Sequence, residues 1–415
     1  MLILKKGNAV MLMKWITLAC IGTFAGQINA TIIFDDGGTH TINNIVFDDI
    51  VLGNGSGLNI VQGGLVITDG IDPAISRITS TESAVTLSGN ATVLGSINLN
   101  GPGGSDDSDS ALIARENSLI VGQGGYSNSV ARAAISGAHY VEINDNSRIV
   151  GSTGTNRGGA AIENGDSGHF HVTVNGGEII GGEGGQSGGY GINPSYDGID
   201  LDITGGSIRG GYGAVNGGTG VVNVNYGTVV MTDGAIYGGD GGASGGDAFS
   251  TRDYINMDIY GGQIQGGSGG SYGGSGISIL QAEPANIQIF GGQFDAGLGA
   301  IGDGWVFDAS GSGAHMSLFG GLIGYNSVGE GFNIENNGII DVYGWDLKLD
   351  DGFLTGYLMD GNWIETPVTL ARMSLQDRGL RLFNHDNVRV PEPSTLLLMA
   401  IGIAGIGVTQ RKRLN

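Results

Sequence analysis

The sequence predicts an all-β chain that folds as a right-handed parallel β-helix, a solenoid of about eleven coils with roughly 29 residues in each. Three observations lead to this prediction. Gly accounts for 83 of the 415 residues, which would be costly inside long helices. A Gly-Gly pair, or an equivalent pair, recurs along the chain at a nearly constant spacing. A large apolar residue follows each pair in the same register.

Composition and charge exclude several other classes of protein. The 7 Pro residues and the lack of a strict Gly-X-Y period exclude collagen. A chain with 40% hydrophobic and only 14% charged residues is too apolar for a disordered acidic protein. Lys and Arg total 18 against 40 Asp and Glu, which gives a net charge of -22. Because phosphate binding requires clustered basic side chains, no nucleic acid partner is expected. No cofactor is expected either.

The residue pairs define the repeat. They begin at Gly63, Gly89, Asn117, Asn146, Gly176, Gly205, Asp233, Gly261, Gly291 and Gly320, with a shorter copy at Gly344. Aligning the copies on these pairs produces one column of large apolar side chains: Val66, Val93, Ile120, Ile149, Ile179, Ile208, Ile236, Ile264, Phe294 and Ile323. We expect this column to point into the core, where stacked coils bury it continuously.

Each copy also contains short strands. Just before the pair, apolar and polar residues alternate, as at Val172 and Val174, which indicates a strand with one buried face. The copy that begins at Phe170 therefore contains a strand, a tight corner, a second strand and a Gly-rich loop. A third strand follows at Tyr190 to Asn193. Three strands and three turns per copy favour a β-helix over a β-sandwich array, which would need hairpin turns roughly every 8–12 residues.

The ends of such a rod expose sheet edges and need covers. We expect an N-terminal cap at residues 31–54, the repeats at 55–345 and a C-terminal cap at 346–372, where the period changes. Residues 373–390 are expected to be a linker.

Residues 1–30 have the pattern of a secretory signal peptide, which we expect to form an N-terminal helix. Lys5, Lys6 and Lys14 precede an apolar stretch, and Ala30 is a small residue at the expected cleavage site. The partners predicted for export are signal peptidase and the general secretion machinery. A lipoprotein signal around Cys20 is a poorer match, because Thr17 stands where a larger aliphatic residue is usual. Cleavage at Ala30 would leave no cysteine, so disulfide bonds are not expected.

Residues 391–415 form a second targeting signal. Pro391, Glu392 and Pro393 precede the uncharged stretch 394–410, which is long enough for a transmembrane helix, and Arg411, Lys412 and Arg413 follow as a cytoplasmic stop. This order resembles the PEP-CTERM sorting signal of Gram-negative bacteria. The resemblance implies recognition by an exosortase, a membrane-embedded cysteine transpeptidase, in bacteria that tend to make extracellular polysaccharide. It also implies export, membrane anchoring before processing, and a final place at the cell surface or outside the cell.

Candidate catalytic and metal-binding residues are few. Asp202, Asp258 and Asp341 share an outward strand position, but other residues separate them in neighbouring coils, whereas sugar hydrolysis uses converging carboxylates. His169 and His171 near Asp166 form a weaker set than a zinc site requires. The stretch Gly241 to Asp247 lacks the nine-residue period of a calcium-binding β-roll. We therefore predict no catalytic residues and no metal site.

One outward column is predicted to be a ligand platform. The position before the Gly pair is aromatic in four successive coils, at Tyr260, Phe290, Phe319 and Tyr343. These rings either bind a glycan or are covered by the C-terminal cap, since contiguous exposed apolar area usually makes a contact. We predict a structural or adhesive protein of the cell surface or matrix, associated with exopolysaccharide or biofilm. The alternative is a β-helical polysaccharide lyase or hydrolase.

Overall fold

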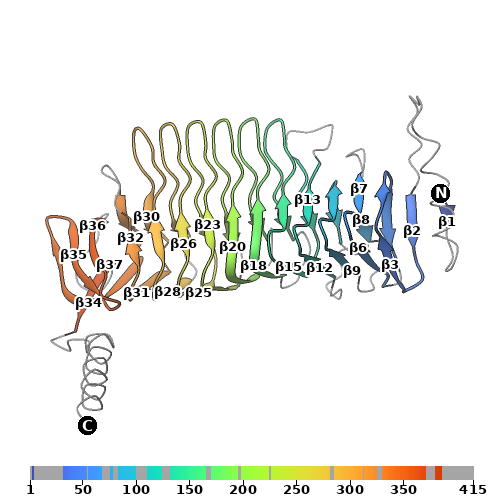
Figure 1. Cartoon of the computed structure of the whole chain (residues 1–415). Coiled ribbons are helices and arrows are strands. Elements are labelled where there is room, and N and C mark those ends of the chain that lie inside the picture. The colour runs from blue at the N-terminus through green and yellow to red at the C-terminus, as the bar shows by residue number, and fades with distance from the viewer. Residues whose placement is uncertain are drawn as a thin grey trace, which may run out of the picture.

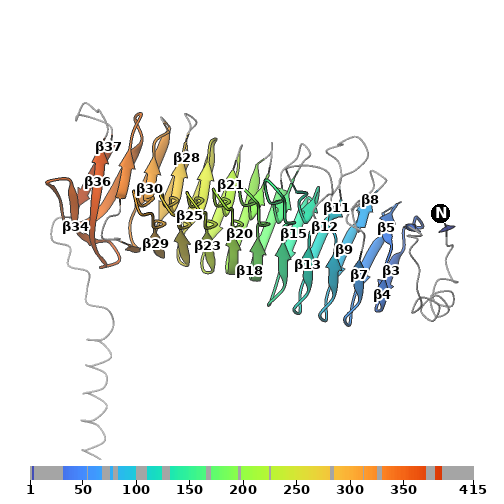
Figure 2. The ribbon, with the colours of Figure 1, turned by 90° about the horizontal axis from the view of Figure 1, so that it is seen from above.

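Short parallel strands stack along one axis in the computed structural model, which confirms the predicted parallel β-solenoid (Figures 1 and 2). The structure describes residues 2–3, 31–53, 55–67, 75–77, 83–99, 110–123, 131–164, 170–194, 198–223, 226–280, 285–311, 313–324, 330–370 and 379–385. Each turn of the chain contributes strands to three faces of the rod, and each strand pairs with its equivalent in the next turn.

Face 1 carries the strands that precede the Gly pairs. It consists of β3 (Thr39–Ile42), β6 (Gly57–Ile60), β9 (Ala84–Leu87), β12 (Ala111–Ala114), β15 (Tyr140–Ile143), β18 (Phe170–Ile180), β20 (Ile199–Arg209), β22 (Thr228–Met231), β25 (Ile255–Ile259), β28 (Ala285–Ile289), β31 (Ala314–Leu318), β34 (Ile339–Asp350) and β37 (Gly379–Asn384).

Face 2 carries the strands that follow the Gly pairs. It consists of β4 (Ile45–Val46), β7 (Leu65–Ile67), β10 (Thr92–Leu94), β13 (Leu119–Val121), β16 (Arg148–Val150), the second halves of β18 and β20, β23 (Ala235–Tyr237), β26 (Gln263–Gln265), β29 (Gln293–Asp295) and β32 (Leu322–Ile323).

Face 3 closes the cross-section. It consists of β1 (Leu2–Ile3), β2 (Thr31–Phe34), β5 (Asp49–Leu52), β8 (Ile75–Arg77), β11 (Ile97–Asn98), β14 (Ile135–Ser136), β17 (Ile162–Glu163), β19 (Ile192–Asn193), β21 (Val221–Asn223), β24 (Phe249–Thr251), β27 (Ile277–Ile279), β30 (Trp305–Ala309), β33 (Glu330–Ile334) and β36 (Trp363–Leu370). β35 (Phe353–Leu358) lies outside the three ladders.

The predicted apolar column points inward. Its members from Val66 to Phe294 are buried, and Ile323 is half-buried at the end of face 2. Phe249, Phe307 and Phe332 of face 3 pack into the same core. The Gly pairs form the corner between faces 1 and 2, where the chain takes a left-handed conformation, as at Gly206 with φ of 73°. Gly tolerates this conformation best, and in an earlier coil the corner takes it one position sooner, at Asn117 with φ of 62°.

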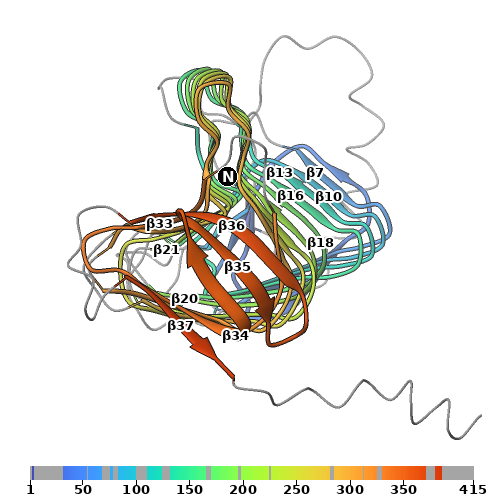
Figure 3. The same cartoon turned by 90° about the vertical axis from the view of Figure 1, so that its left-hand side faces the viewer.

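The Gly-rich loops between faces 2 and 3 stack into a thin fin. Loops 151–161, 181–191, 210–220, 238–248, 266–276 and 296–306 project together from one side of the rod (Figures 1 and 3). Backbone hydrogen bonds form within and between loops: Gly218 donates across its own loop to Gly211 at 2.9 Å, and Gly239 of the next loop donates to Gly218 at 2.7 Å. The two sides of each loop touch backbone to backbone, so a methyl group at Gly210 would overlap the carbonyl oxygen of Gly218. Close approach, rather than backbone handedness, therefore requires Gly here.

The last described loop of the fin differs from the others at Asp303. In the preceding loop the amide of Gly269 donates to the carbonyl oxygen of Leu298 in the next loop, at 2.8 Å. The amide of Gly299 instead donates to the Asp303 carboxylate at 2.7 Å. Asp303 follows Gly302, whose partner in the preceding loop is Tyr272, so the loop-to-loop equivalent of Asp303 is Gly273. The Asp303 side chain thus takes the place of the acceptor that the following loop supplies to Gly269.

The two ends of the rod differ. Residues 31–54, expected as an N-terminal cap, contain β2 to β5, which pair in the same parallel ladders as the later coils. In the expected C-terminal cap, the second half of β34 pairs antiparallel with β35, and β35 pairs antiparallel with β36. Buried Leu347, Leu354 and Ile364 hold this sheet across the end of the core (Figure 3).

The expected linker contains a strand that the sequence analysis missed. Within residues 373–390, β37 pairs parallel with β34 from Ile339 opposite Gly379 to Gly344 opposite Asn384. Leu380 and Leu382 pack against the core and hold this strand on face 1. The folded body thus continues closer to the sorting signal than predicted.

Candidate functional site

The predicted aromatic column forms a continuous stack on face 1. Ring centroids are 5.0 Å apart for Tyr260 and Phe290, 5.1 Å for Phe290 and Phe319, and 4.4 Å for Phe319 and Tyr343. The ring planes deviate from parallel by 6–15°. β37 adds Phe383, whose ring stacks on Tyr343 at 4.6 Å. We call these five residues the aromatic ladder.

In the aromatic ladder, the face of each ring packs against the face of the next ring. Offset stacking of this kind stabilises the pairs it joins by roughly 0.5–1.5 kcal/mol each. The ring edges of Tyr260 and Phe290 remain accessible, with exposed fractions of 53% and 37%. A ligand can therefore reach the interior rings at their edges. Tyr260 is the last ring of the ladder, and the residue at its position in the preceding coil is the smaller Thr232. This geometry differs from a row of open ring faces.

The C-terminal cap reaches only part of the aromatic ladder. The amide of Met359 donates to the carbonyl oxygen of Phe319 at 2.8 Å. The amide of Gly321 donates to the carboxylate of Asp360 at 2.6 Å. Phe319 and Tyr343 are half-buried, whereas Tyr260 and Phe290 lie beyond the cap and are exposed. The cap thus covers the part of the column at Phe319 and Tyr343, while the part at Tyr260 and Phe290 stays open to a ligand.

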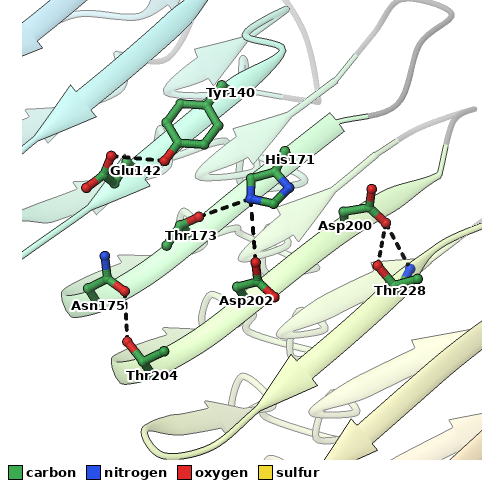
Figure 4. A network of polar contacts seen from close by, with 9 residues as sticks. All are labelled: Tyr140, Glu142, His171, Thr173, Asn175, Asp200, Asp202, Thr204 and Thr228. Atoms are coloured by element: carbon green, nitrogen blue, oxygen red, sulfur yellow. Dashed lines mark hydrogen bonds and ion pairs between the residues drawn. The ribbon is translucent and has the colours of Figure 1, made fainter.

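The same outward column is polar in the earlier coils. Thr204 donates to the side-chain oxygen of Asn175 at 2.8 Å (Figure 4). Asn175 donates to the side-chain oxygen of Asn144 at 3.0 Å, and Asn144 donates to Glu142 of its own coil at 2.9 Å. The first two bonds join successive coils in the way that ring stacking joins the later ones.

His171 belongs to a polar cluster on the outside of face 1. Its ring stacks on Tyr140 at 5.4 Å, and its Nε2 lies 3.2 Å from the Thr173 hydroxyl and 3.6 Å from the Asp202 carboxylate (Figure 4). The Tyr140 hydroxyl donates to Glu142 at 2.9 Å, and burial raises the pKa of Tyr140. His169 and Asp166 lie outside the described residues. Among the residues that are described, no three His, Cys, Asp or Glu side chains are grouped to hold a metal ion.

The predicted carboxylate column is in register but interrupted. Along face 1, the order is Asp202, Val230, Asp258, Gln288, Ser317 and Asp341. Within this column no two carboxylates are neighbours, so it does not supply the acid and base pair of a glycosidase.

Asp341 is already engaged in an ion-pair cluster. This buried carboxylate accepts bonds from Arg381 Nε and Nη2 at 2.5 Å each and lies 2.9 Å from His315 Nε2. Burial raises the pKa of Asp341, but its bonds to Arg381 and His315 outweigh burial and hold the pKa below its usual value. Because Arg381 comes from β37, this cluster fastens the last strand to the body.

Two other acidic groups lie near the base of the fin. Burial raises the pKa of Asp247 to about 6, although its carboxylate accepts a bond from the Ser275 amide at 2.8 Å. Burial also raises the pKa of Asp308, which accepts a bond from Asn333 at 3.0 Å. Asp247 ends the stretch Gly241 to Asp247, and the nearby charge of Asp308 adds to the rise of its pKa.

The residues predicted to act in the two targeting signals lie outside the described part of the chain, although Leu2–Ile3 of the predicted signal peptide form β1 and pair with β2. The predicted residues are Ala30, Pro391, Glu392, Pro393, Arg411, Lys412 and Arg413. The predicted transmembrane helix at 394–410 lies there as well. Within the described ranges, no helix is long and apolar enough to cross a membrane.

Comparison with known proteins identifies the C-terminal signal. Residues 389–413 match the family model of the PEP-CTERM protein-sorting motif. No curated protein and no solved structure matches the chain. The sorting motif indicates an exported protein that is processed by exosortase, and the structure adds that its passenger is a β-solenoid.

Proposed function

We propose that this exported chain is a structural or adhesive rod of the cell surface or extracellular matrix of a Gram-negative bacterium, associated with exopolysaccharide. The observation that carries the proposal is the use of outward side chains on face 1. They bond or stack from coil to coil along the rod, as Thr204 does with Asn175 and Phe290 with Phe319. Contacts that run from one coil to the next stiffen the solenoid, because its stability depends on the interfaces between neighbouring coils.

Exopolysaccharide is the proposed partner for two reasons. PEP-CTERM proteins tend to occur in bacteria that make extracellular polysaccharide. The uncovered part of the aromatic ladder, at Tyr260 and Phe290, offers exposed apolar rings beside the polar side chains of Asp258 and Gln288. Rings of this kind suit the mixed polar and apolar surface of a sugar.

A polysaccharide lyase or hydrolase is the weaker candidate. It would require carboxylates that converge on one substrate. On face 1, Val230 separates Asp202 from Asp258, and Asp341 is bound by Arg381 and His315. We therefore assign these carboxylates to the framework of the rod.

The experiment compares Glu392→Ala with the wild type in cells with and without exosortase. If Pro391-Glu392-Pro393 is the recognised motif, the variant should remain in the membrane at higher mass, as the wild type does without exosortase. Glu183→Ala, at an exposed position in the fin, serves as the control and should be sorted normally.

The second half of the experiment concerns the matrix. Processed wild-type protein should be retained on exopolysaccharide purified from the producing strain. Processed protein that stays free in the medium and is not retained would contradict the structural role in the matrix, even if sorting depends on Glu392.

A further inference from the structure

The outer face of the C-terminal cap carries a cluster of exposed apolar side chains. Trp363 is 50% exposed, Tyr357 45%, Phe353 39% and Met359 36%. We call these four residues the end patch. Clustered exposed apolar side chains often mark a contact surface.

Strand pairing brings the end patch together. Tyr357 of β35 lies opposite Trp363 of β36, with ring centroids 4.9 Å apart in an edge-to-face arrangement. The alternate residues Leu354 and Ile364 are buried against the core. The end patch therefore points away from the solenoid at its C-terminal end, where the cap sheet closes the rod (Figure 3).

The chain leaves the folded body beside the same end. β37 is held to β34 by the bonds between Arg381 and Asp341. Asn384 accepts a bond from the Leu347 amide at 2.7 Å and donates to its carbonyl oxygen at 3.0 Å. The amide of His385 donates to Gly344 at 2.9 Å. These contacts fix the point from which the sorting signal extends.

The distance from this point to the membrane segment is short. Residues 386–393 separate His385 from the uncharged stretch 394–410. Eight residues span at most about 29 Å when fully extended. A chain anchored through 394–410 therefore keeps the C-terminal end of the rod within this distance of the hydrocarbon core.

We propose that the end patch rests on the lipid headgroup layer while the sorting signal still anchors the chain. Trp and Tyr favour this layer because their rings are apolar and their N–H and O–H groups are polar. The proposal rests on the anchored, exported form described above and adds the surface that this form presents to the bilayer.

Charge and geometry favour zwitterionic lipid over other occupants. Glu365 lies on the outward face of β36 beside Trp363, whose indole N–H donates to it at 3.4 Å. Asp346, Asp350 and Asp351 belong to the same cap, and Lys348 is the basic residue among its described residues. These carboxylates disfavour anionic headgroups and a second acidic cap. In addition, two copies anchored in one bilayer both direct their end patches toward it, so the patches cannot face each other.

The test uses the full chain in phosphatidylcholine vesicles with and without bromine on the acyl chains. Trp15, Trp305 and Trp345 are replaced by Phe, so that Trp363 is the remaining tryptophan. We expect brominated lipid to quench its fluorescence. The matched control moves the tryptophan to the fin with Tyr212→Trp and Trp363→Phe, because Tyr212 is also 50% exposed. This control should be equally bright in both lipids.

A second measurement avoids substitution. In the vesicle-bound wild type, hydroxyl radicals should modify Tyr357 and Trp363 less than Tyr212 and Tyr272, whose exposed fractions in the free body are similar. Equal modification of the four rings would overturn the proposal. Protection of Trp363 without quenching by brominated lipid would also overturn it, since a protein would then cover the end patch.

The result separates this proposal from the function of the rod. A chain that floats with vesicles but leaves Trp363 unquenched contradicts the lipid contact alone. A chain that does not float with vesicles lacks the anchor, which overturns the lipid contact too. Neither result changes the expected retention of the processed protein on exopolysaccharide.

Discussion

Gly273→Ala tests whether the fin is held by backbone contact. A methyl group at Gly273 would overlap the carbonyl oxygen of Gly297 and lie 2.6 Å from the amide nitrogen of Gly304. Both obstacles are backbone atoms of the fin, which cannot turn aside as a side chain can. Loop 266–276 must therefore separate from loop 296–306.

The cost can be worked from the contacts that separation breaks. Gly273 donates to Gly302 at 3.0 Å, and Gly297 donates to Gly274 at 2.8 Å. Loss of two bonds at about 1 kcal/mol each, with roughly 1–3 kcal/mol for overpacking, predicts a destabilisation of about 3–5 kcal/mol. Reduced freedom of the unfolded chain offsets about 0.4–1 kcal/mol of this.

Gly302→Ala is the matched control in the neighbouring loop. Its methyl group would meet only ring carbons of Tyr272, at 3.6 and 3.9 Å. We expect unchanged or slightly higher stability, because the substitution restricts the unfolded chain without a clash.

Thermal unfolding followed by circular dichroism, with hydrogen exchange of loops 266–276 and 296–306, measures the difference. Solenoid repeats open locally, so exchange should respond more strongly than the global transition. Equal exchange and equal melting of the two variants would refute backbone packing as the reason for Gly in the fin.

Three further predictions concern the core, the aromatic ladder and the base of the fin. Ile208→Asp places an unpaired charge in the buried column and should lower stability by several kcal/mol, measured by urea unfolding and protease resistance; an unchanged profile would show that the column does not point inward. Phe290→Ala with Phe319→Ala should weaken retention on exopolysaccharide if the edges of the rings bind it, whereas earlier melting with normal retention would identify the ladder as purely structural. Asp247 has its folded pKa raised to about 6, above its ordinary 3.8, so the stability it contributes is complete below pH 3.8 and is lost as the pH rises through 6. Asp247→Asn should therefore gain stability relative to the wild type between pH 4 and 7, and parallel pH profiles would contradict the raised pKa.

The repeat was predictable because every coil needs the same residue types at the same positions. Ile208 and Ile236 occupy one register, and the corner at Gly206 needs a residue that accepts positive φ. Such signals lie within a few residues of one another and recur along the chain. They indicate the solenoid and the register of the aromatic ladder without knowledge of any distant contact.

The arrangement of the rings was not predictable from register alone. Tyr260, Phe290, Phe319 and Tyr343 share a column in the sequence, but only the structure turns their planes face to face. Their side-chain rotamers depend on neighbours in adjacent coils. Phe383 was missed because it lies in a strand of six residues, too short for a clear period.

The local pattern follows from the amino-acid sequence: the repeat, the inward column, the Gly corners and the sorting motif. The arrangement at the C-terminal end of the rod depends on contacts between residues far apart in the chain, so it emerges only in the folded structure. Arg381 reaches Asp341 across 40 positions to hold β37, and Gly321 donates to Asp360 across 39 positions to hold the cap. A single pair of this kind has no repeat to reveal it, so the strand and the end patch appear only when the chain is folded.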